Sequence, residues 1–382
     1  MDRRLYPLES RPKNQDRRLA ETMTADAARR SDAIAIARVI CILGVVYVHA
    51  WTGLNGHDLE IARGTPQENL RWLLMEIFGR SAVPLLGVIS GWLVGGSART
   101  QNWVRHVLRK ARTILLPMVM WNGLAILFVS GAAWLLHLPA PMPVSLDWLF
   151  QELFIVSRNP DINVQMPFLR DLFLCMVAAP LLVRLPGWAL LGVAGVAALA
   201  QLMGWGPPLL MRPAILLFFI IGMIARRQGL ADRVAALSWP AAAMPFALLM
   251  GVQLYFSLQA VQGAGLGVGL LDLAVRMAAA TCFWRLSWAL AGSPARGLLL
   301  RIEPFAFFLF CSHLILIWLG GPVLGALFGK LGSPLYPAYL LVQPLLVLIA
   351  VLLLGSLLSR AAPRMTTLLS GGRLQPLFPS SG

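Results

Sequence analysis

Long uninterrupted apolar runs, separated by short polar loops, are the main pattern of this chain. A transmembrane helix needs about 20 mostly apolar residues, and ten runs come near that length. They cover residues 33–52, 72–95, 113–137, 167–184, 187–204, 209–225, 236–258, 266–290, 303–320 and 335–358. The pattern predicts an all-α membrane protein, a bundle of about ten transmembrane helices over 33–358, with a leader (1–32) and a tail (359–382).

Composition excludes an ordinary soluble protein. Hydrophobic residues make up 58% of the 382 residues, charged residues only 13%, and the mean hydropathy is +0.71, so too little polar surface is available. The first apolar run is of full span length and follows a polar leader, which argues against a cleavable signal peptide. The Arg-rich leader is expected to be flexible or to lie on the inner leaflet.

Lysine and arginine positions predict the orientation of the spans. With the N-terminus in the cytoplasm, 22 of the 32 basic residues lie on the cytoplasmic side and six on the other, as the positive-inside rule requires. Both termini are therefore expected to be cytoplasmic. The net charge of +15 then reflects topology and contact with the anionic lipid bilayer, and no nucleic-acid partner is expected.

Metal and nucleotide motifs are not found in the sequence. The four cysteines, Cys41, Cys175, Cys282 and Cys311, lie in apolar segments without metal-like spacing and are expected to be packing residues. The five histidines are scattered, so no metal is expected. No phosphate-binding loop of the P-loop type and no dinucleotide fingerprint occurs, so energy coupling through ATP has no support.

Arg38 and His49 are the strongly polar residues of the first span. Eleven residues at about 100° and ~1.5 Å each place both side chains on one helix face, roughly 16 Å apart. An arginine at the centre of a membrane helix costs about 2.5–3.5 kcal/mol, so it normally has a partner. Either one long ligand contacts both residues, or Arg38 forms a structural ion pair with Asp171, Glu76 or Glu303.

Other polar residues lie in the spans at helical spacing. Glu76 and Arg80 are four residues apart and therefore lie on one helix face. Asp272 and Arg276 have the same spacing and are expected to form an ion pair, which lowers the cost of inserting both. For the second pair a structural role is favoured.

The second span also contains a proline and an SG pair. Pro84 and Ser90-Gly91 are expected to bend or thin the helix and to leave backbone carbonyls for neighbouring groups. In the ninth span, His313 is interpreted as either a hydrogen-bonded core histidine or a catalytic residue.

Six segments in the same order are similar to one known family. They are Arg38 with His49; Arg80 to Gly91, which reads R-x-x-VPL-x-x-x-x-SG; the basic stretch Trp103 to Pro117; Phe168 to Leu182; Ile215 to Arg227; and Pro304 to Ile317. Over residues 31 to 358 the chain resembles the bacterial integral-membrane acyltransferase family 3, which contains O-antigen and exopolysaccharide O-acetyltransferases. One departure is Leu85-Leu86 and Trp92, where the family often has phenylalanines, and this indicates a differently shaped acceptor pocket.

The resemblance implies acyl transfer from a CoA thioester, with acetyl-CoA as donor and no metal. His49 is expected to be the general base and Arg38 its catalytic partner. Cytoplasmic arginines would bind the anionic nucleotide of CoA, although a topological signal alone would also explain them. The donor-binding residues predicted in this way are Arg80, Ser90, Arg105, Arg109 and Arg112.

The acceptor site is expected on the outer face. The segment 138–166 and the loop after His49 combine aromatic and carboxylate residues, which suit a sugar but would also suit an interfacial aromatic belt. The predicted substrate-binding residues are Trp51, Trp148, Glu152, Asp171 and His313. A lipid-linked oligosaccharide, a nascent exopolysaccharide and a periplasmic glucan all fit as acceptors.

The sequence therefore predicts a multi-pass O-acyltransferase of the bacterial inner membrane. It would transfer acetyl to a glycan or lipid-linked oligosaccharide, with polysaccharide assembly proteins as further partners. A transporter or exporter is the main alternative, because buried Arg, Asp and His are also typical of transporters. Internal repeats would favour that alternative, and no clear similarity between the halves is visible. A non-catalytic partner in a polysaccharide assembly complex is a third interpretation.

Overall fold

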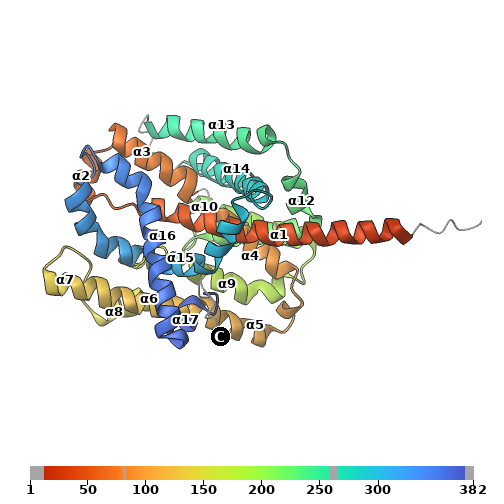
Figure 1. Ribbon diagram of the computed structural model, residues 1–382, viewed down its shortest axis with the longest axis horizontal. Helices are drawn as coiled ribbons and strands as arrows, with labels where there is room; N and C mark the ends of the chain where they lie inside the picture. Colours follow the sequence, from red (N-terminus) through yellow and green to blue (C-terminus); the bar gives the residue numbers. More distant parts are fainter. Residues whose placement is uncertain (1–12, 81–82, 259–264, 375–382) are drawn as a thin grey trace, which may run out of the picture.

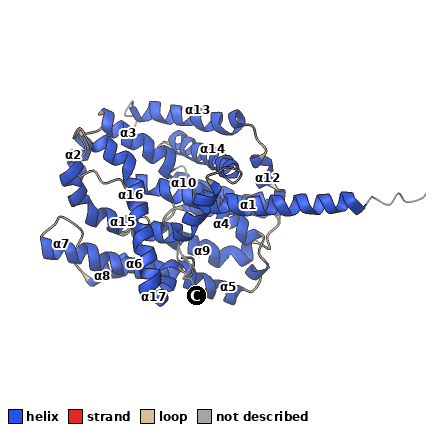
Figure 2. Ribbon diagram, in the orientation of Figure 1, coloured by secondary structure: helices blue, strands red, loops and turns tan. Residues whose placement is uncertain are grey.

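The computed structural model describes residues 13–80, 83–258 and 265–374, and these residues form helices and connecting loops without a strand (Figures 1 and 2). Helices account for 79% of the described residues, so the prediction of an all-α membrane protein is confirmed. The first residues of the leader and the last residues of the tail lie outside the described residues, as do 81–82 of the second predicted span.

The first half of the chain alternates α-helices with short π-helical segments. It comprises α1 (Lys13–Val48), α2 (Gly56–Ile61), α3 (Pro66–Leu74), the π-helix η1 (Met75–Arg80), α4 (Val83–Gly95), the 3₁₀ turn η2 (Ala98–Thr100), α5 (Trp103–Lys110), the π-helix η3 (Ala111–Leu115), α6 (Leu116–Ala125), the π-helix η4 (Ile126–Ser130), α7 (Gly131–Leu136), α8 (Leu146–Phe154) and α9 (Pro167–Leu182).

The second half contains longer, uninterrupted helices. It comprises α10 (Gly187–Met203), α11 (Pro213–Gln228), α12 (Leu230–Ala235), α13 (Trp239–Leu258), α14 (Leu266–Leu290), α15 (Arg296–Phe328), α16 (Tyr336–Ala361) and α17 (Pro363–Ser370). Gly204 and Gly229, both with positive φ, follow α10 and α11 directly, because glycine adopts the left-handed conformation that ends a helix without strain.

Helix α1 crosses the body of the protein and extends beyond it on one side (Figure 1). Its helical conformation begins at Lys13 and continues without a break into the first predicted span. A helix that is already nucleated by the packed segment extends at little cost into the residues before it. The expectation that the leader 1–32 is flexible or lies on the inner leaflet stays a prediction.

Seven helical segments in the described residues are long and apolar enough to cross a membrane. They are Ala25–Val48, Pro66–Gly95, Trp103–Leu136, Trp239–Ser257, Leu266–Leu290, Arg296–Phe328 and Tyr336–Ala361. The predicted count of about ten is not confirmed. The remaining three predicted spans correspond to α9, α10 and α11, of 16, 17 and 16 residues, whose length of about 25 Å at 1.5 Å per residue is less than the ~30 Å apolar core of a bilayer.

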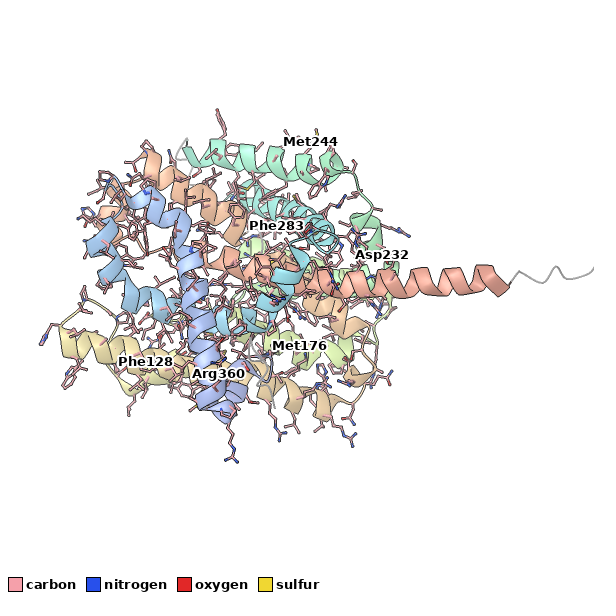
Figure 3. The ribbon with its side chains drawn as sticks, viewed as in Figure 1. Phe128, Met176, Asp232, Met244, Phe283 and Arg360 are labelled. Atoms are coloured by element: carbon pink, nitrogen blue, oxygen red, sulfur yellow. The ribbon has the colours of Figure 1, made fainter. Side chains whose placement is uncertain are left out.

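The side chains show an apolar interior and an apolar exterior (Figure 3). Met176 of α9 and Phe283 of α14 are buried, whereas Met244 of α13 and Phe128 of η4 are exposed on the outside. A soluble protein would cover such helices with polar residues, so the exposed apolar faces are those expected to contact lipid.

Two close helix crossings position the centre of the bundle. At Gly91 of α4 an added Cβ would collide with the backbone carbonyl of Phe219 in α11, and at Gly222 of α11 it would collide with the carbonyl of Val88. At Gly44 of α1 it would likewise collide with the carbonyl of Phe78 in η1. Only glycine permits backbones to approach this closely in a membrane bundle, so α1 with η1, and α4 with α11, each form a closely packed, rigid pair.

Candidate active site

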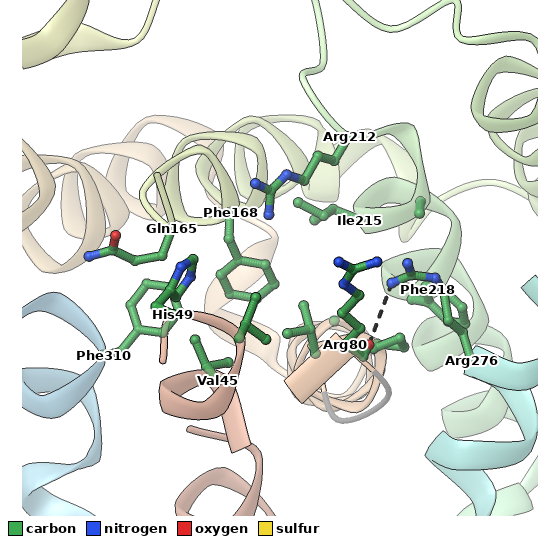
Figure 4. A pocket seen from close by; sticks show the side chains of 15 residues that line it. Val45, His49, Arg80, Gln165, Phe168, Arg212, Ile215, Phe218, Arg276 and Phe310 are labelled. Carbon is green, nitrogen blue, oxygen red and sulfur yellow. Dashed lines mark hydrogen bonds between the residues drawn. The ribbon is translucent and has the colours of Figure 1, made fainter. Parts of the chain in front are cut away.

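The C-terminal end of α1 borders a cavity of about 380 Å³ between α1, η1, α4, α9, α11, α14 and α15. Its polar wall comprises His49, Gln165, Arg80, Arg212 and Arg276. The apolar wall includes the rings of Phe168, Phe218 and Phe310 (Figure 4). The volume is within the range of small-molecule sites, about 300–1,000 Å³.

His49 follows the last residue of α1, and its backbone N–H donates to the carbonyl of Val46 over 3.2 Å. The Gly44 crossing holds this end of α1 against η1. As a result the imidazole reaches the cavity from a rigid helix end. It lies within electrostatic range of His313, Arg212 and Arg80.

His313 lies next to His49, with the ring centroids 5.4 Å apart. Its side chain is fully buried, and Nδ1 is 2.8 Å from the carbonyl oxygen of Phe310 and 3.2 Å from that of Leu309. Because a carbonyl only accepts, Nδ1 carries the proton and Nε2 is an acceptor; within the described residues Nε2 has no hydrogen-bond partner. His313 is not on the cavity wall, so it contributes to the environment of His49.

Arg80 and Arg276 are each held at the cavity by a carboxylate four residues earlier in the chain. Asp272 pairs with Arg276 at 2.7 Å, as predicted, and Glu76, on the same helix face as Arg80, pairs with it at 2.9 Å. Pro84 has no N–H for the carbonyl of Arg80 four residues earlier, and Nη1 of Arg276 donates to that carbonyl over 3.4 Å (Figure 4). The prediction that a neighbour satisfies a carbonyl freed in this span is therefore confirmed.

Arg212 reaches the cavity from the turn before α11, and Asp171 determines the shape of that turn. The buried Asp171 carboxylate accepts the backbone N–H groups of Met211 at 3.2 Å and Arg212 at 2.7 Å, and it pairs with Arg170 at 2.7 Å. Asp171 was predicted to bind substrate. In the structure it is not on the cavity wall and instead fixes the backbone that carries Arg212.

Gln165 ends a chain of buried amides that reaches the cavity. Asn122 donates to the carbonyl of Leu153 at 3.0 Å, Asn163 donates to Asn122 at 3.1 Å, and Gln165 donates to Asn163 at 3.5 Å. Since the Gln165 NH₂ group is used in this way, its Oε1 is left as a buried acceptor without a partner in the described residues.

Arg38 lies away from the cavity wall and pairs with Glu303 of α15 at 2.9 Å. This is one of the three ion pairs that the sequence offered as the structural interpretation of Arg38. Both side chains remain partly exposed, at 38% and 28%, so the pair is accessible from outside the protein. The cavity that His49 borders therefore does not include Arg38 in its wall.

A basic cluster surrounds the Arg38–Glu303 pair. Lys110 is within electrostatic range of Arg373, Arg109 and Arg38. Arg373 donates to the carbonyls of Thr113 at 2.8 Å and Ser370 at 3.1 Å, and burial lowers the pKa of its guanidinium to about 10. We call Arg38, Arg109, Lys110 and Arg373 the basic mouth.

The predicted donor-binding residues are distributed unevenly about these sites. Arg109 belongs to the basic mouth, and Arg80 lies in the cavity. Arg105 and Arg112 are exposed on the surface. The hydroxyl of Ser90 donates to the carbonyl of Leu86 within its own helix at 2.8 Å, so the SG pair serves local helix structure and packing.

The predicted sugar-binding aromatics are engaged in internal contacts. Trp51 donates its backbone N–H to Gln343 at 3.2 Å, accepts the hydroxyl of Tyr336 at 2.9 Å and packs edge-on against Tyr339. Its ring also fills the space above Gly321 of α15. Trp51 thereby anchors the turn that follows His49.

Trp148 and Glu152 stabilise the loop between α8 and α9. The indole of Trp148 donates to Asp161 at 2.7 Å, and the carboxylate of Glu152 accepts the N–H groups of Asp161 and Ile162, both at 2.8 Å. Burial raises the pKa of Glu152 although these N–H donors oppose the rise. Neither side chain is on the cavity wall.

Sequence reasoning missed Arg212, Gln165 and Arg276 as cavity residues, and Arg373 as a member of the basic mouth. Their positions in the sequence gave weak signals: Arg212 directly precedes the proline that begins α11, and Arg276 was interpreted as one half of an ion pair. Within the described residues, His, Cys, Asp and Glu form no group of three that could hold a metal ion.

Comparison with known proteins identifies the class. The acyltransferase 3 family model, described as an acyltransferase domain, matches residues 31–360, so the chain belongs to this family and is a membrane acyltransferase. It is also similar to the succinoglycan biosynthesis protein ExoH of Rhizobium meliloti (strain 1021), with 28% identity over 373 residues that cover 91% of this chain and 93% of that protein. No solved structure matches the chain.

Proposed function

We propose that this protein is an inner-membrane O-acyltransferase that transfers acetyl from cytoplasmic acetyl-CoA to a hydroxyl of a surface polysaccharide or its lipid-linked precursor. The observation that carries the proposal is the position of His49, at a rigid helix end on the wall of a cavity large enough for a sugar. Family membership supports the reaction class. The relative's role in succinoglycan biosynthesis supports a polysaccharide acceptor.

His49 would act as general base in this reaction. Its imidazole takes the proton of the acceptor hydroxyl while the oxygen attacks the thioester carbonyl. The new ester bond forms, the carbon–sulfur bond breaks, and the CoA thiolate leaves and takes up a proton. Gln165 Oε1 lies on the same wall and has no hydrogen-bond partner among the described residues, so it is suited to accept from a second hydroxyl of the same sugar.

The donor would bind from the opposite side of the protein. The basic mouth of Arg38, Arg109, Lys110 and Arg373 suits the phosphates of the CoA nucleotide, because guanidinium and ammonium groups bind phosphate strongly. A pantetheine arm of roughly 16 Å, the distance of eleven helical residues, would then follow α1 from Arg38 to His49. Because the cavity does not extend to Arg38, this path requires the helices beside α1 to move apart when the donor binds. This proposal requires the N-terminal half of α1 to face the cytoplasm.

The decisive experiment is a transfer assay with purified protein, labelled acetyl-CoA and a panel of lipid-linked sugars. We expect His49→Ala to lower the rate by about 10²–10⁴, the usual loss of a general base, with unchanged thermal stability. His57→Ala is the matched control, because His57 is exposed on α2 and its loss should leave the rate unchanged. Folded wild-type protein that moves no label, as a transporter would behave, contradicts the proposal.

A further inference from the structure

The cavity has two chemically different ends (Figure 4). His49, Gln165 and Phe310 lie together at one end, whereas Arg80, Arg212 and Arg276 gather at the other. None of the fifteen residues that line this cavity is an aspartate or a glutamate. Three guanidinium groups therefore face a space whose wall supplies no negative charge.

Each of the three arginines contacts an acceptor that is not part of the cavity wall. Glu76 and Asp272 pair with Arg80 and Arg276. Arg212 donates through Nη2 to the carbonyl of Val164 at 3.2 Å. A guanidinium has five N–H donors in a planar fork, so these contacts fix the groups and leave further donors for a ligand.

The three cations also lie close enough to repel one another. Arg212 is within electrostatic range of both Arg80 and Arg276, and Arg80 and Arg276 are joined through a backbone hydrogen bond. Like charges held together in a partly dry site are unfavourable. Asp171, Glu76 and Asp272 offset part of this cost, and an anion among the three guanidinium groups would lower it further. Arginine forks match the geometry of carboxylate and phosphate oxygens.

We propose that Arg80, Arg212 and Arg276 form an anion subsite that holds a carboxylate or phosphate group of the acceptor while its hydroxyl lies at His49. This rests on the proposed function, because it places the acceptor in the cavity. The donor nucleotide is assigned to the basic mouth, and a transferred acetyl group has no charge. The subsite thus selects an acidic sugar or a sugar attached to phosphate.

A binding experiment tests the subsite without requiring catalysis. Full-length protein in detergent is titrated at constant ionic strength with sodium glucuronate, glucose 1-phosphate and glucose. We expect one of the two anionic sugars, or both, to bind about ten-fold or more tightly than glucose, as charge-assisted hydrogen bonds imply. The comparison of glucuronate with glucose 1-phosphate distinguishes a carboxylate from a phosphate.

Arg212→Gln should remove the preference for the anionic sugar and leave glucose binding unchanged. This variant is chosen because the backbone N–H of Arg212, which donates to Asp171, is retained by glutamine. The double variant E76Q/R80Q, which removes a pair without leaving a lone carboxylate, should have the same effect. Arg158→Gln is the control, because Arg158 is an exposed arginine that pairs with Asp147 and does not line the cavity.

The outcomes separate this proposal from the proposed function. Arginine-dependent binding of anionic sugars without any transfer would contradict only the function. Three results would overturn the subsite. They are transfer without a preference for anionic acceptors, equal binding of all three sugars, and equal losses of anionic-sugar binding in Arg158→Gln and Arg212→Gln. An effect of Arg212→Gln limited to donors whose acyl group carries its own carboxylate would assign the anion to the acyl group and overturn its assignment to the acceptor.

Discussion

Individual side chains in this protein are fixed by groups that do not themselves face the cavity. Main-chain carbonyls hold Nδ1 of His313, and a chain of amides holds Gln165. Asp171 holds the backbone of Arg212. Such support keeps a site in a productive geometry because rotamers locked by packing and hydrogen bonds do not need to reorganise. Several residues that sequence reasoning assigned to substrate are support of this kind.

Glu152 offers a test of one such supporting residue. Burial raises its pKa above the ordinary 4.5, so the folded state binds this proton more tightly than the unfolded state. Folding stability must therefore fall as pH rises from about 4.5 through the folded-state pKa. Glu152→Gln removes the titration, so we expect the variant to gain thermal stability relative to wild type as pH increases, measured by melting in detergent from pH 4 to 8.

Asp147→Asn is the control for this experiment. Asp147 lies on the same helix, and its side chain is 69% exposed, so its removal should leave the pH dependence of melting unchanged. A stability deficit of Glu152→Gln that grows with pH would show that the charged form is the favoured one and would contradict the expected direction.

At the scale of elements, glycine contacts determine how the helices cross. Gly91 and Gly222 meet each other's helices at backbone carbonyls, and Gly44 does the same between α1 and η1. Helix packing therefore explains the glycine of the SG segment, because a Cβ at Gly91 would push α4 and α11 apart. The π-helix η1 lies at this junction, where it brings both Arg80 and the Gly44 contact to the end of α1.

Gly91→Ala and Gly222→Ala are each expected to destabilise the protein by about 1–3 kcal/mol, the usual cost of overpacking a tight interface. The physical reason is that a backbone carbonyl, unlike a flexible side chain, cannot move aside. Thermal melting of purified variants measures the change. Gly195→Ala in α10 is the control, because its Cβ would meet nothing within 4 Å and alanine favours a helix by up to about 1 kcal/mol. Equal melting temperatures for all three variants would contradict this account of the crossing.

At the scale of the whole molecule, the Arg38–Glu303 pair joins α1 to α15 across 265 residues of chain. A charge swap separates its structural role from its proposed role toward the donor. We expect Glu303→Gln to lower both melting temperature and activity, since it leaves Arg38 without its carboxylate. The double variant R38E/E303R should recover melting temperature, because the pair is restored in reverse, yet stay at least about ten-fold below wild type in transfer, because the cation has moved to α15.

Recovery of both properties in the double variant would show that Arg38 acts only as a structural ion pair. Topology must be verified in each variant by accessibility labelling, since changes in positive charge are able to reorient spans.

The basic mouth predicts which arginines affect donor binding. Lys110 and Arg373 lie near Arg38, whereas Arg105 and Arg112 are exposed on the surface. We therefore expect K110Q/R373Q to weaken acetyl-CoA binding several-fold more than R105Q/R112Q, and the difference to shrink at high salt as phosphate charges are screened. Calorimetric titration with CoA measures the affinity of each double variant at low and at high salt. A larger loss of affinity in R105Q/R112Q would assign the donor site to the exposed surface instead of the basic mouth.

The class of protein and much of its local structure could be predicted from the amino-acid sequence alone. Apolar runs, low charge and the order of the motifs identify an all-α membrane acyltransferase, as the helices and the family match confirm. The pairs Glu76–Arg80 and Asp272–Arg276 were also predictable. Such properties follow from composition, hydropathy and spacing along one helix, and these are local in the chain.

Only the tertiary structure decided which residues share a site. Arg212, Gln165 and Arg276 come from different helices and meet His49 in one cavity, while Arg38, on the helix that leads to His49, lies outside it and pairs with Glu303. Trp148 and Glu152 proved to hold a loop. Spacing along a helix determines the face on which a side chain lies, but its partner depends on how separate helices cross. In this protein the crossings are set by contacts between distant segments, such as Gly91 with Phe219. The sequence of one segment alone does not specify such a contact.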